Sequence, residues 1–455
     1  MTSVMRRGIK VLGTSAVVLL VVTACVMEPV NRTPYKKMDY YRLALSRLDS
    51  LKSSPLPEKG ALLKVGWAKV NMTPTRHVPL SGYGARKGAP SIGVHDSVYV
   101  RTFVFTNEVD TSVLITLDAL IVPPTVTYEL QARLPEIGYH FSQLFLTATH
   151  THCSMGAWGD SWIGEKFAGD YDQEVVDSIT GAILTSIQEA ASSVELANLA
   201  YSEYSVPDLV SNRLVGDKGI IDPWFRVVKI AKASGATALI TTFAAHATVL
   251  GPDEMRFSRD YPGSLVDSLE AMDEIDFAAF CAGAVGSHRP QSGGFRDYKR
   301  IGWLASELAY NVKNGTVDLP AREISKLRTV QLNLPLREPH WRIGRNWRLR
   351  PWLFRWLTEP SPAYLSLLRL GDIVFVGTPC DFSGELMPPI VRTARENGQE
   401  VLVTSFNGGY VGYITKDDWY DLKEYETFYM NWFGPYNGAY FVEIIQKMLA
   451  LVHHL

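Results

Sequence analysis

Short runs of apolar and β-branched residues alternate along the chain with longer segments in which apolar residues recur at helical spacing. The runs predict strands at residues 98–106, 112–117, 143–149, 225–231, 238–243, 277–280, 329–336, 364–370, 373–376 and 400–405. The periodic segments predict helices at residues 38–51, 125–133, 173–193, 262–272, 299–312, 385–396 and 439–451. The order of residues 112–149 is typical of a right-handed crossover between parallel strands, whereas residues 326–377 favour antiparallel pairing. We therefore expect an α/β fold with a mixed β-sheet core flanked by helices.

The first 24 residues predict a bacterial lipoprotein signal peptide. A basic start at Arg6 and Arg7 precedes an apolar run over residues 11–22, which is short for a membrane span because a transmembrane helix needs about 20 apolar residues. The run ends in Val22-Thr23-Ala24-Cys25, which resembles a lipobox with Cys25 as the lipidated residue. A simple signal anchor with a buried cysteine is the alternative.

This interpretation predicts three parts of the chain and a cellular location for the protein. Residues 1–24 would be the signal peptide, residues 25–60 a lipidated tether with an N-terminal helix, and residues 61–455 one large domain. The protein would then be lipid-anchored in the bacterial cell envelope, as a periplasmic or outer-membrane lipoprotein.

Composition and charge are those of an ordinary globular protein. The chain of 455 residues has 45 Lys and Arg against 47 Asp and Glu, with 46% hydrophobic residues. Because there is no basic excess, a nucleic-acid partner is not expected. Apart from Cys25, only Cys153, Cys281 and Cys380 are present, and three cysteines cannot form a closed disulfide framework.

Residues that can bind metals follow four of the predicted strands. His150 comes directly after the strand ending at Thr149, and His246 follows residues 238–243. Asp381 follows residues 373–376, and the tyrosines Tyr410 and Tyr413 follow residues 400–405. Sites in open α/β sheets lie outside the carboxyl ends of strands, and nitrogen and oxygen donors converging there suit a metal. The pattern favours a metal site at the C-terminal edge of the strands.

Several motifs, in order along the chain, carry a resemblance to a known family. The most specific motif is Ala148-Thr149-His150-Thr151-His152. The others are Gly66-Trp67-Ala68-Lys69-Val70-Asn71-Met72-Thr73-Pro74, Ser81-Gly82-Tyr83-Gly84, Gly93-Val94-His95-Asp96, Asn212-Arg213, residues 243–248, Ser258-Arg259-Asp260-Tyr261, Tyr413-Ile414-Thr415, Tyr425-Glu426 and Phe433-Gly434-Pro435. Together they resemble the catalytic domain of the neutral/alkaline non-lysosomal ceramidase family, whose members are zinc-dependent amidases that split ceramide into sphingosine and fatty acid.

The resemblance implies a catalytic Zn²⁺ and assigns its ligands. These would be His150, His246, Asp381 and Tyr413, with Asp381 in the position of a family glutamate. Cys380 is an alternative ligand, since thiolates bind zinc well. Zinc with an open coordination position lowers the pKa of bound water to about 7, which provides a nucleophile at neutral pH.

The resemblance also implies roles for residues around the metal. His152 would carry a proton to the leaving amine; the alternative is a hydrogen bond that only orients the loop. Arg213 or Tyr425 would stabilise the oxyanion. We expect Tyr410 to contact the substrate.

One stretch departs from the family pattern. A Gly-Asp-Val-Ser-Pro motif supplies an essential serine in the family, whereas this chain has Gly286-Ser287-His288-Arg289-Pro290. Ser287 would replace that serine only after a loop shift, which favours direct attack by metal-activated water. Arg289 beside the metal would favour an anionic substrate, and His288 would be an additional ligand or acid.

The leading hypothesis is a membrane-tethered, zinc-dependent hydrolase of C–N amide bonds that acts on an N-acylated lipid or related amide. The alternatives are a catalytically inactive lipoprotein that binds a lipid or glycan, and a zinc esterase or lactonase. Residues 337–356, rich in Trp and Arg, are either a lipid-facing element or a surface insertion whose tryptophans pack on the body.

Overall fold

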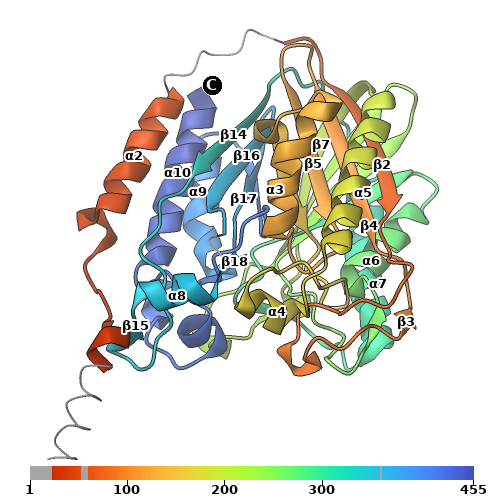
Figure 1. The fold of residues 1–455 in the computed structure, drawn as a ribbon. Coiled ribbons are helices and arrows are strands. Elements are labelled where there is room, and N and C mark those ends of the chain that lie inside the picture. Colours follow the sequence, from red (N-terminus) through yellow and green to blue (C-terminus); the bar gives the residue numbers. More distant parts are fainter. Residues whose placement is uncertain (1–22, 53–59, 359–360, 455) are drawn as a thin grey trace, which may run out of the picture.

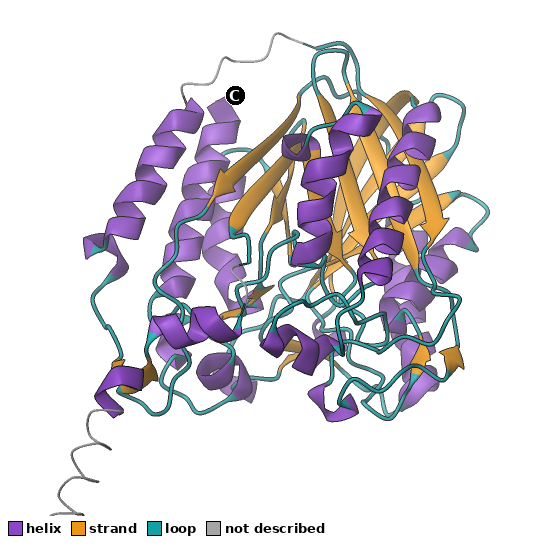
Figure 2. Ribbon diagram, viewed as in Figure 1, coloured by secondary structure: helices purple, strands orange, loops and turns teal. Residues whose placement is uncertain are grey.

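Two β-sheets packed face to face, with helices on both outer sides, form the body of the protein (Figure 1, Figure 2). The computed structural model describes residues 23–52, 60–358 and 361–454. The larger sheet has the strand order β12-β10-β9-β7-β2-β4-β5-β6. Its strands are β2 (Lys64–Asn71), β4 (Tyr99–Thr106), β5 (Thr111–Leu117), β6 (Leu144–Ala148), β7 (Glu195–Ser205), β9 (Trp224–Lys232), β10 (Thr237–Phe243) and β12 (Phe277–Ala282).

The smaller sheet has the order β14-β16-β17-β19. Its strands are β14 (Leu327–Asn333), β16 (Tyr364–Leu370), β17 (Ile373–Gly377) and β19 (Glu400–Thr404). Four short two-stranded pairs lie outside the two sheets: β1 (Met27–Pro29) with β15 (Trp347–Leu349), β3 (Gly93–Val94) with β11 (Arg256–Phe257), β8 (Val210–Asn212) with β13 (His288–Pro290), and β18 (Asp381–Phe382) with β20 (Tyr413–Ile414).

Helices cover the outer face of each sheet. The larger sheet carries α3 (Pro124–Arg133), α5 (Gln173–Ser192), α6 (Asp260–Glu270) and α7 (Asp297–Gly315), and the smaller sheet carries α2 (Asp39–Lys52), α9 (Met387–Glu396) and α10 (Asn437–His454). Two short helices, α4 (Trp162–Ala168) and α8 (Pro351–Leu357), lie at one end of the sheets, at the bottom of Figure 1. None of the helices in the described ranges combines the length and hydrophobicity that a membrane span requires.

The central core lies between the two sheets. Phe103, Phe105 and Phe145 of the larger sheet share one buried cluster with Phe375 and Leu402 of the smaller sheet. Strands β10 and β12 are buried along their whole length, because both faces of the sheet are covered there. The sequences of such strands are continuous apolar runs, and for this reason the sequence pattern predicted both strands.

The expected fold class is confirmed: both sheets are mixed and helices flank them. The predicted crossover is present, since β5 and β6 are parallel and α3 connects them. The predicted antiparallel pairing of β14, β16 and β17 is also present. The pattern missed β2 and β7, whose sequences mix lysine, glutamate and small residues because part of each strand faces solvent.

Candidate metal centre and substrate pocket

Curvature of the larger sheet brings two histidines together. His150 follows the end of β6, and His246 follows the end of β10, six strands away in the sheet order. The edge strand β12 packs back against β5, where Thr116 Oγ1 donates a hydrogen bond to Phe280 O over 2.8 Å. The carboxyl ends of β6 and β10 therefore meet, although the strands are far apart in hydrogen-bonding order.

The smaller sheet contributes a carboxylate and a tyrosine to the same place. β17 leads into β18 with Asp381, and β19 leads towards β20 with Tyr413. β18 and β20 pair in parallel, with Asp381 opposite Tyr413. Because the two sheets pack face to face, all four predicted ligands arise beyond the carboxyl ends of strands at one end of the molecule.

Three histidines and one carboxylate converge at the ends of these strands. His150 Nε2 lies 2.7 Å from His246 Nε2. His152 Nε2 lies 3.4 Å from the first and 3.3 Å from the second. Asp381 Oδ1 lies 3.4 Å from His150 Nε2 and 3.9 Å from His246 Nδ1. The three histidines form a group that can hold a metal ion.

Backbone carbonyls and one aromatic ring orient two of these histidines. His150 Nδ1 is 2.6 Å from Leu120 O, and His246 Nδ1 is 3.4 Å from Val285 O. The Phe406 ring stacks on the His150 ring, with centroids 4.1 Å apart. With the Nδ1 proton of each ring directed at a carbonyl, the Nε2 lone pairs point at each other, which is the tautomer that metal-binding histidines adopt.

Burial keeps the imidazoles neutral. It lowers the pKa of His150 to about 3, and it lowers the pKa values of His152 and His246 well below the ordinary value. Burial raises the pKa of Asp381 to about 7, against the opposing effects of its bond to Tyr410 and the charge of Arg213. Neutral imidazole is the form that binds metals.

The arrangement fits a divalent cation. Facing imidazole lone pairs repel one another, and Asp381 Oδ1 is buried without a hydrogen-bond partner in the part of the chain that the structure describes. A buried carboxylate oxygen left unpaired is costly, and a cation between these atoms would satisfy all of them. Histidine nitrogens with one carboxylate oxygen are the donor set of many zinc sites.

A network of phenols and one ion pair surrounds Asp381. Tyr410 donates a hydrogen bond from its hydroxyl to Asp381 Oδ2 over 2.7 Å. Arg213 Nη2 donates to the Tyr413 hydroxyl over 3.0 Å, and Arg213 Nε lies 2.9 Å from Glu426 Oε1. Tyr410, expected at the substrate, thus also fixes the carboxylate, and Glu426 is a charge partner that sequence reasoning did not assign.

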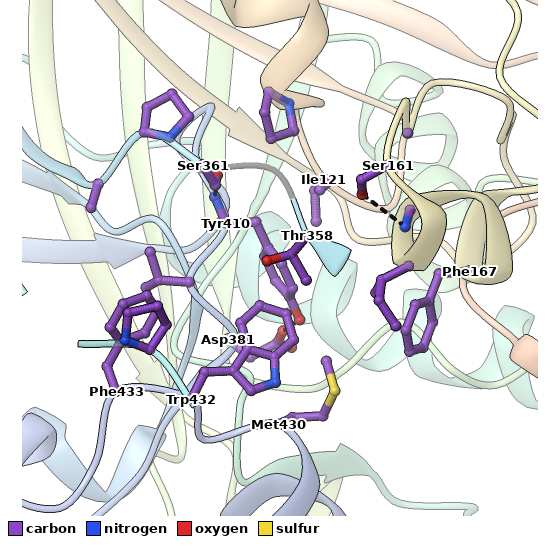
Figure 3. A pocket seen from close by; sticks show the side chains of 18 of the residues that line it. Ile121, Ser161, Phe167, Thr358, Ser361, Asp381, Tyr410, Met430, Trp432 and Phe433 are labelled. Atoms are coloured by element: carbon purple, nitrogen blue, oxygen red, sulfur yellow. Dashed lines mark hydrogen bonds between the residues drawn. The ribbon is translucent and has the colours of Figure 1, made fainter. Parts of the chain in front are cut away.

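The cluster lies at the base of a pocket with a volume of about 700 Å³ (Figure 3). Figure 3 shows Tyr410 and Asp381 near the centre of the pocket, with Trp432 at the lower left, Met430 below and Phe167 of α4 at the right. The lining also includes His150, His152, Tyr413 and Tyr425, together with residues of α8 and many apolar side chains. Most of these apolar residues were not predicted, because they lie in loops, and because α4 and α8, which contribute the others, are too short to produce a periodic pattern.

The structure does not bring Ser287, His288 and Arg289 into the cluster, which corrects their expected roles. Side chains alternate along β13, so that His288 is buried and Arg289 is exposed, with its Nε 3.4 Å from Ser211 Oγ. His288 Nε2 accepts from the Asp222 N–H over 2.8 Å, and its Nδ1 lies 2.7 Å from Ser287 Oγ. His288 thus has no free nitrogen for a metal, Arg289 is not beside the metal donors, and none of the three lines the pocket.

Cys380, the alternative ligand, belongs to a hydrophobic cluster. Burial raises the pKa of its thiol well above the ordinary value, which opposes the thiolate form that a metal needs. The geometry favours Asp381.

Comparisons with known proteins agree with this architecture. Residues 63–294 match the family described as neutral/alkaline non-lysosomal ceramidase, N-terminal. The chain belongs to this family. Two solved structures share the fold: the neutral ceramidase from Pseudomonas aeruginosa and a ceramidase complexed with C2. The first has a TM-score of 0.74 at 18% identity over 88% of this chain and 75% of the other. The second has a TM-score of 0.72 at 18% identity over 87% of this chain and 76% of the other. No curated protein matches the sequence.

Membership confirms the resemblance read from the motifs and supports a ceramidase-like hydrolase. Residues 148–152, the most specific part of the resemblance, supply two imidazoles of the cluster, those of His150 and His152. The divergent stretch around Ser287 lies within the matched residues and is folded away from the pocket.

Proposed function

We propose that this member of the ceramidase family is a zinc-dependent hydrolase of the amide bond in an N-acylated lipid. One observation carries the proposal: neutral imidazoles and an unpaired buried carboxylate oxygen converge at the base of a largely apolar pocket. The pocket suits an acyl chain or similar apolar group, and the polar cluster at its base suits the bond to be cleaved.

His150, His246 and Asp381 would hold the metal, and Tyr413 remains the predicted fourth ligand. Zinc in such a site supplies Lewis-acid activation of water and of the amide carbonyl. The second nitrogens of His150 and His246 are directed at carbonyls, as those of metal ligands usually are.

His152 differs from the other two histidines and suits proton transfer. Its ring lines the pocket, and within the described residues its Nδ1 makes no hydrogen bond to a side chain. An imidazole that reaches the substrate can accept a proton and pass it to the leaving amine. Arg213 and Tyr425 provide donors for the developing oxyanion, with Arg213 held by Glu426 and Tyr425 exposed at the pocket.

Turnover of a panel of N-acyl lipids and their matched O-esters, followed by mass spectrometry, tests the proposal. We expect amide cleavage that a chelator abolishes and that added Zn²⁺ restores. His246→Ala should lose both metal and activity. His152→Ala should keep the metal and lose about 10²- to 10⁴-fold in kcat. His77→Ala, at an exposed histidine outside the pocket, is the matched control.

Stoichiometric zinc without turnover of any amide or ester would contradict the proposal and favour the lipid-binding alternative. Faster cleavage of the esters would favour the esterase alternative. Loss of zinc in His152→Ala would make His152 a ligand rather than a proton carrier.

We also propose that Cys25 carries a lipid that anchors the protein in the bacterial cell envelope. The cysteine is exposed and follows the lipobox-like sequence, which supports this assignment. The apolar run at residues 11–22 lies outside the described residues. Radiolabelled palmitate should label the wild-type chain and not Cys25→Ser; equal labelling would contradict the assignment.

A further inference from the structure

The segment of residues 337–356 exposes most of its tryptophans and buries its arginines unevenly. Trp341 packs on Phe354, with ring centroids 4.6 Å apart. In contrast, Trp347, Trp352 and Trp356 are 50%, 51% and 74% exposed. Neither of the two sequence-based readings therefore holds for the whole segment. We call Trp347, Trp352 and Trp356 the tryptophan surface.

The backbone beneath the tryptophan surface is held firmly, so the exposure is built into the fold. The Arg342 guanidinium lies 4.0 Å from the centre of the Tyr420 ring, and its Nη2 donates to Tyr420 O and Thr427 O, each over 2.6 Å. Arg348 Nη2 lies 2.7 Å from Glu28 Oε1. Large apolar side chains that the fold holds in a fixed, exposed position are typical of a site that binds another protein or a membrane.

The predicted lipid-attachment site lies against the same surface. β1 pairs with β15, Arg350 N donates to Val26 O over 2.8 Å, and Trp352 Nε1 donates to Cys25 O over 3.2 Å. A lipid on Cys25 would place a bilayer next to these tryptophans.

The pocket is framed by the same end of the molecule. Residues Phe354, Arg355 and Thr358, from α8 and the residue after it, line the pocket on one side, and residues of α4 line it on the other. α4 adds two exposed aromatic side chains, Trp162 at 56% and Phe167 at 36%. Figure 1 shows α4, α8 and β15 at one end of the sheets, remote from the C-terminus.

We infer that this end of the molecule docks onto a lipid bilayer through Trp347, Trp352 and Trp356, so that the pocket opens at the membrane surface. Tryptophan is favoured at membrane interfaces, because its ring is apolar and its N–H stays hydrated. The docking does not depend on the proposed hydrolysis, since it requires neither metal nor turnover.

Charge on this surface is nearly balanced, which identifies the tryptophans as the main contact. Three arginines of this surface have carboxylate partners. Arg345 Nε lies 3.4 Å from Asp421 Oδ2, Arg350 Nη1 lies 3.3 Å from Glu28 Oε2, and Arg355 Nη2 lies 3.3 Å from Glu338 Oε1. Paired arginines attract anionic lipids weakly. We therefore expect docking to zwitterionic vesicles, with only a modest gain from anionic lipid.

Fluorescence quenching of the full-length chain tests the contact. The protein is bound to phosphatidylcholine vesicles whose acyl chains carry bromine, with and without phosphatidylglycerol. We expect the bromine to quench the tryptophan fluorescence of the wild-type protein. The triple variant Trp347→Phe/Trp352→Phe/Trp356→Phe should lose most of that quenching. It should still bind the vesicles, because phenylalanine keeps the surface apolar. The corresponding triple serine variant should partition at least about tenfold more weakly, equivalent to about 1.4 kcal/mol.

Val109→Ser/Tyr310→Ser is the matched control, because both residues are exposed and lie outside this surface. Val109 sits in the turn before β5, at the opposite end of the sheet from His150. Wild-type protein that sediments with vesicles but is not quenched would overturn the inference, as would equal quenching of the triple phenylalanine variant. Association of the tryptophan surface with a second protein instead of vesicles would also overturn it.

Discussion

Replacing Asp381 by asparagine should weaken metal binding while stabilising the metal-free protein. In the metal-free protein, burial raises the pKa of this carboxyl to about 7 from an ordinary value of 3.8. The folded state then holds the proton more tightly than the unfolded chain, so the unfolding free energy falls as pH rises from about 4 to about 7. A difference of about three pKa units corresponds to at most about 4 kcal/mol above pH 7.

Asparagine would remove this cost and keep the local hydrogen bonds. Its amide oxygen can accept from the Tyr410 hydroxyl, which now bonds Asp381 Oδ2 over 2.7 Å. Its amide N–H₂ can donate towards His150 Nε2, 3.4 Å from the present Oδ1. The variant without metal should therefore gain about 2–4 kcal/mol at pH 8 and little at pH 4.

Metal affinity should change in the opposite direction. Asp381→Asn puts a neutral amide in place of the carboxylate that lies beside the histidines. We expect the affinity for zinc to fall at least about 100-fold, since mutation of groups that only support metal ligands already lowers metal affinity about 10- to 100-fold. Chemical unfolding of chelator-treated protein at pH 4 and pH 8 measures the stability, and competition with a chromophoric chelator measures the affinity. Cys380→Ala is the control and should bind metal like wild type.

The reasoning would be refuted if Asp381→Asn bound zinc as tightly as wild type. It would equally be refuted if the metal-free variant were less stable than wild type at pH 8, because the buried carboxylate would then be favourably placed without a cation.

Three further outcomes are expected. Glu443→Gln should reduce the loss of stability that the protein shows in acid. Burial alone would raise the pKa of Glu443, but hydrogen bonds from Tyr35, Tyr41 and Lys36 lower it to about 2. The stabilisation by Glu443 is therefore complete above about pH 4.5 and is lost as pH falls towards 2, which urea unfolding across this range would show. Gly82→Ala should destabilise the protein by about 1–3 kcal/mol and lower kcat. The reason is that Gly82 has a φ of +105° and that an added Cβ would lie 2.6 Å from His152 Nδ1. A variant with the Tm and kcat of wild type would contradict this prediction. Removing metal with a chelator should lower Tm and adding Zn²⁺ should restore it, as calorimetry would show, whereas an unchanged Tm would mean that the cluster binds no metal in the folded state.

The sequence by itself determined the strands of the two sheets other than β2 and β7, and the kind of chemistry at their ends. β10 and β12 are buried on both faces, so they appear as apolar runs that need no tertiary information. His150, His246 and Asp381 were recognisable because each donor follows such a run. The family motif added His152 and Arg213, and both lie at or beside the cluster.

Only the tertiary structure decided which of these donors meet. Strand β12 packs against β5 and closes the distance between His150 and His246, a contact between residues 116 and 280 that no local pattern encodes. The alternation of side chains along β13 turned Arg289 outward and His288 inward, which alignment to a motif without a strand assignment could not reveal. For the same reason the tryptophans of residues 337–356 divide between a half-buried Trp341 and three exposed positions. A side chain's environment depends on which elements pack beside it, and those elements come from distant parts of the chain.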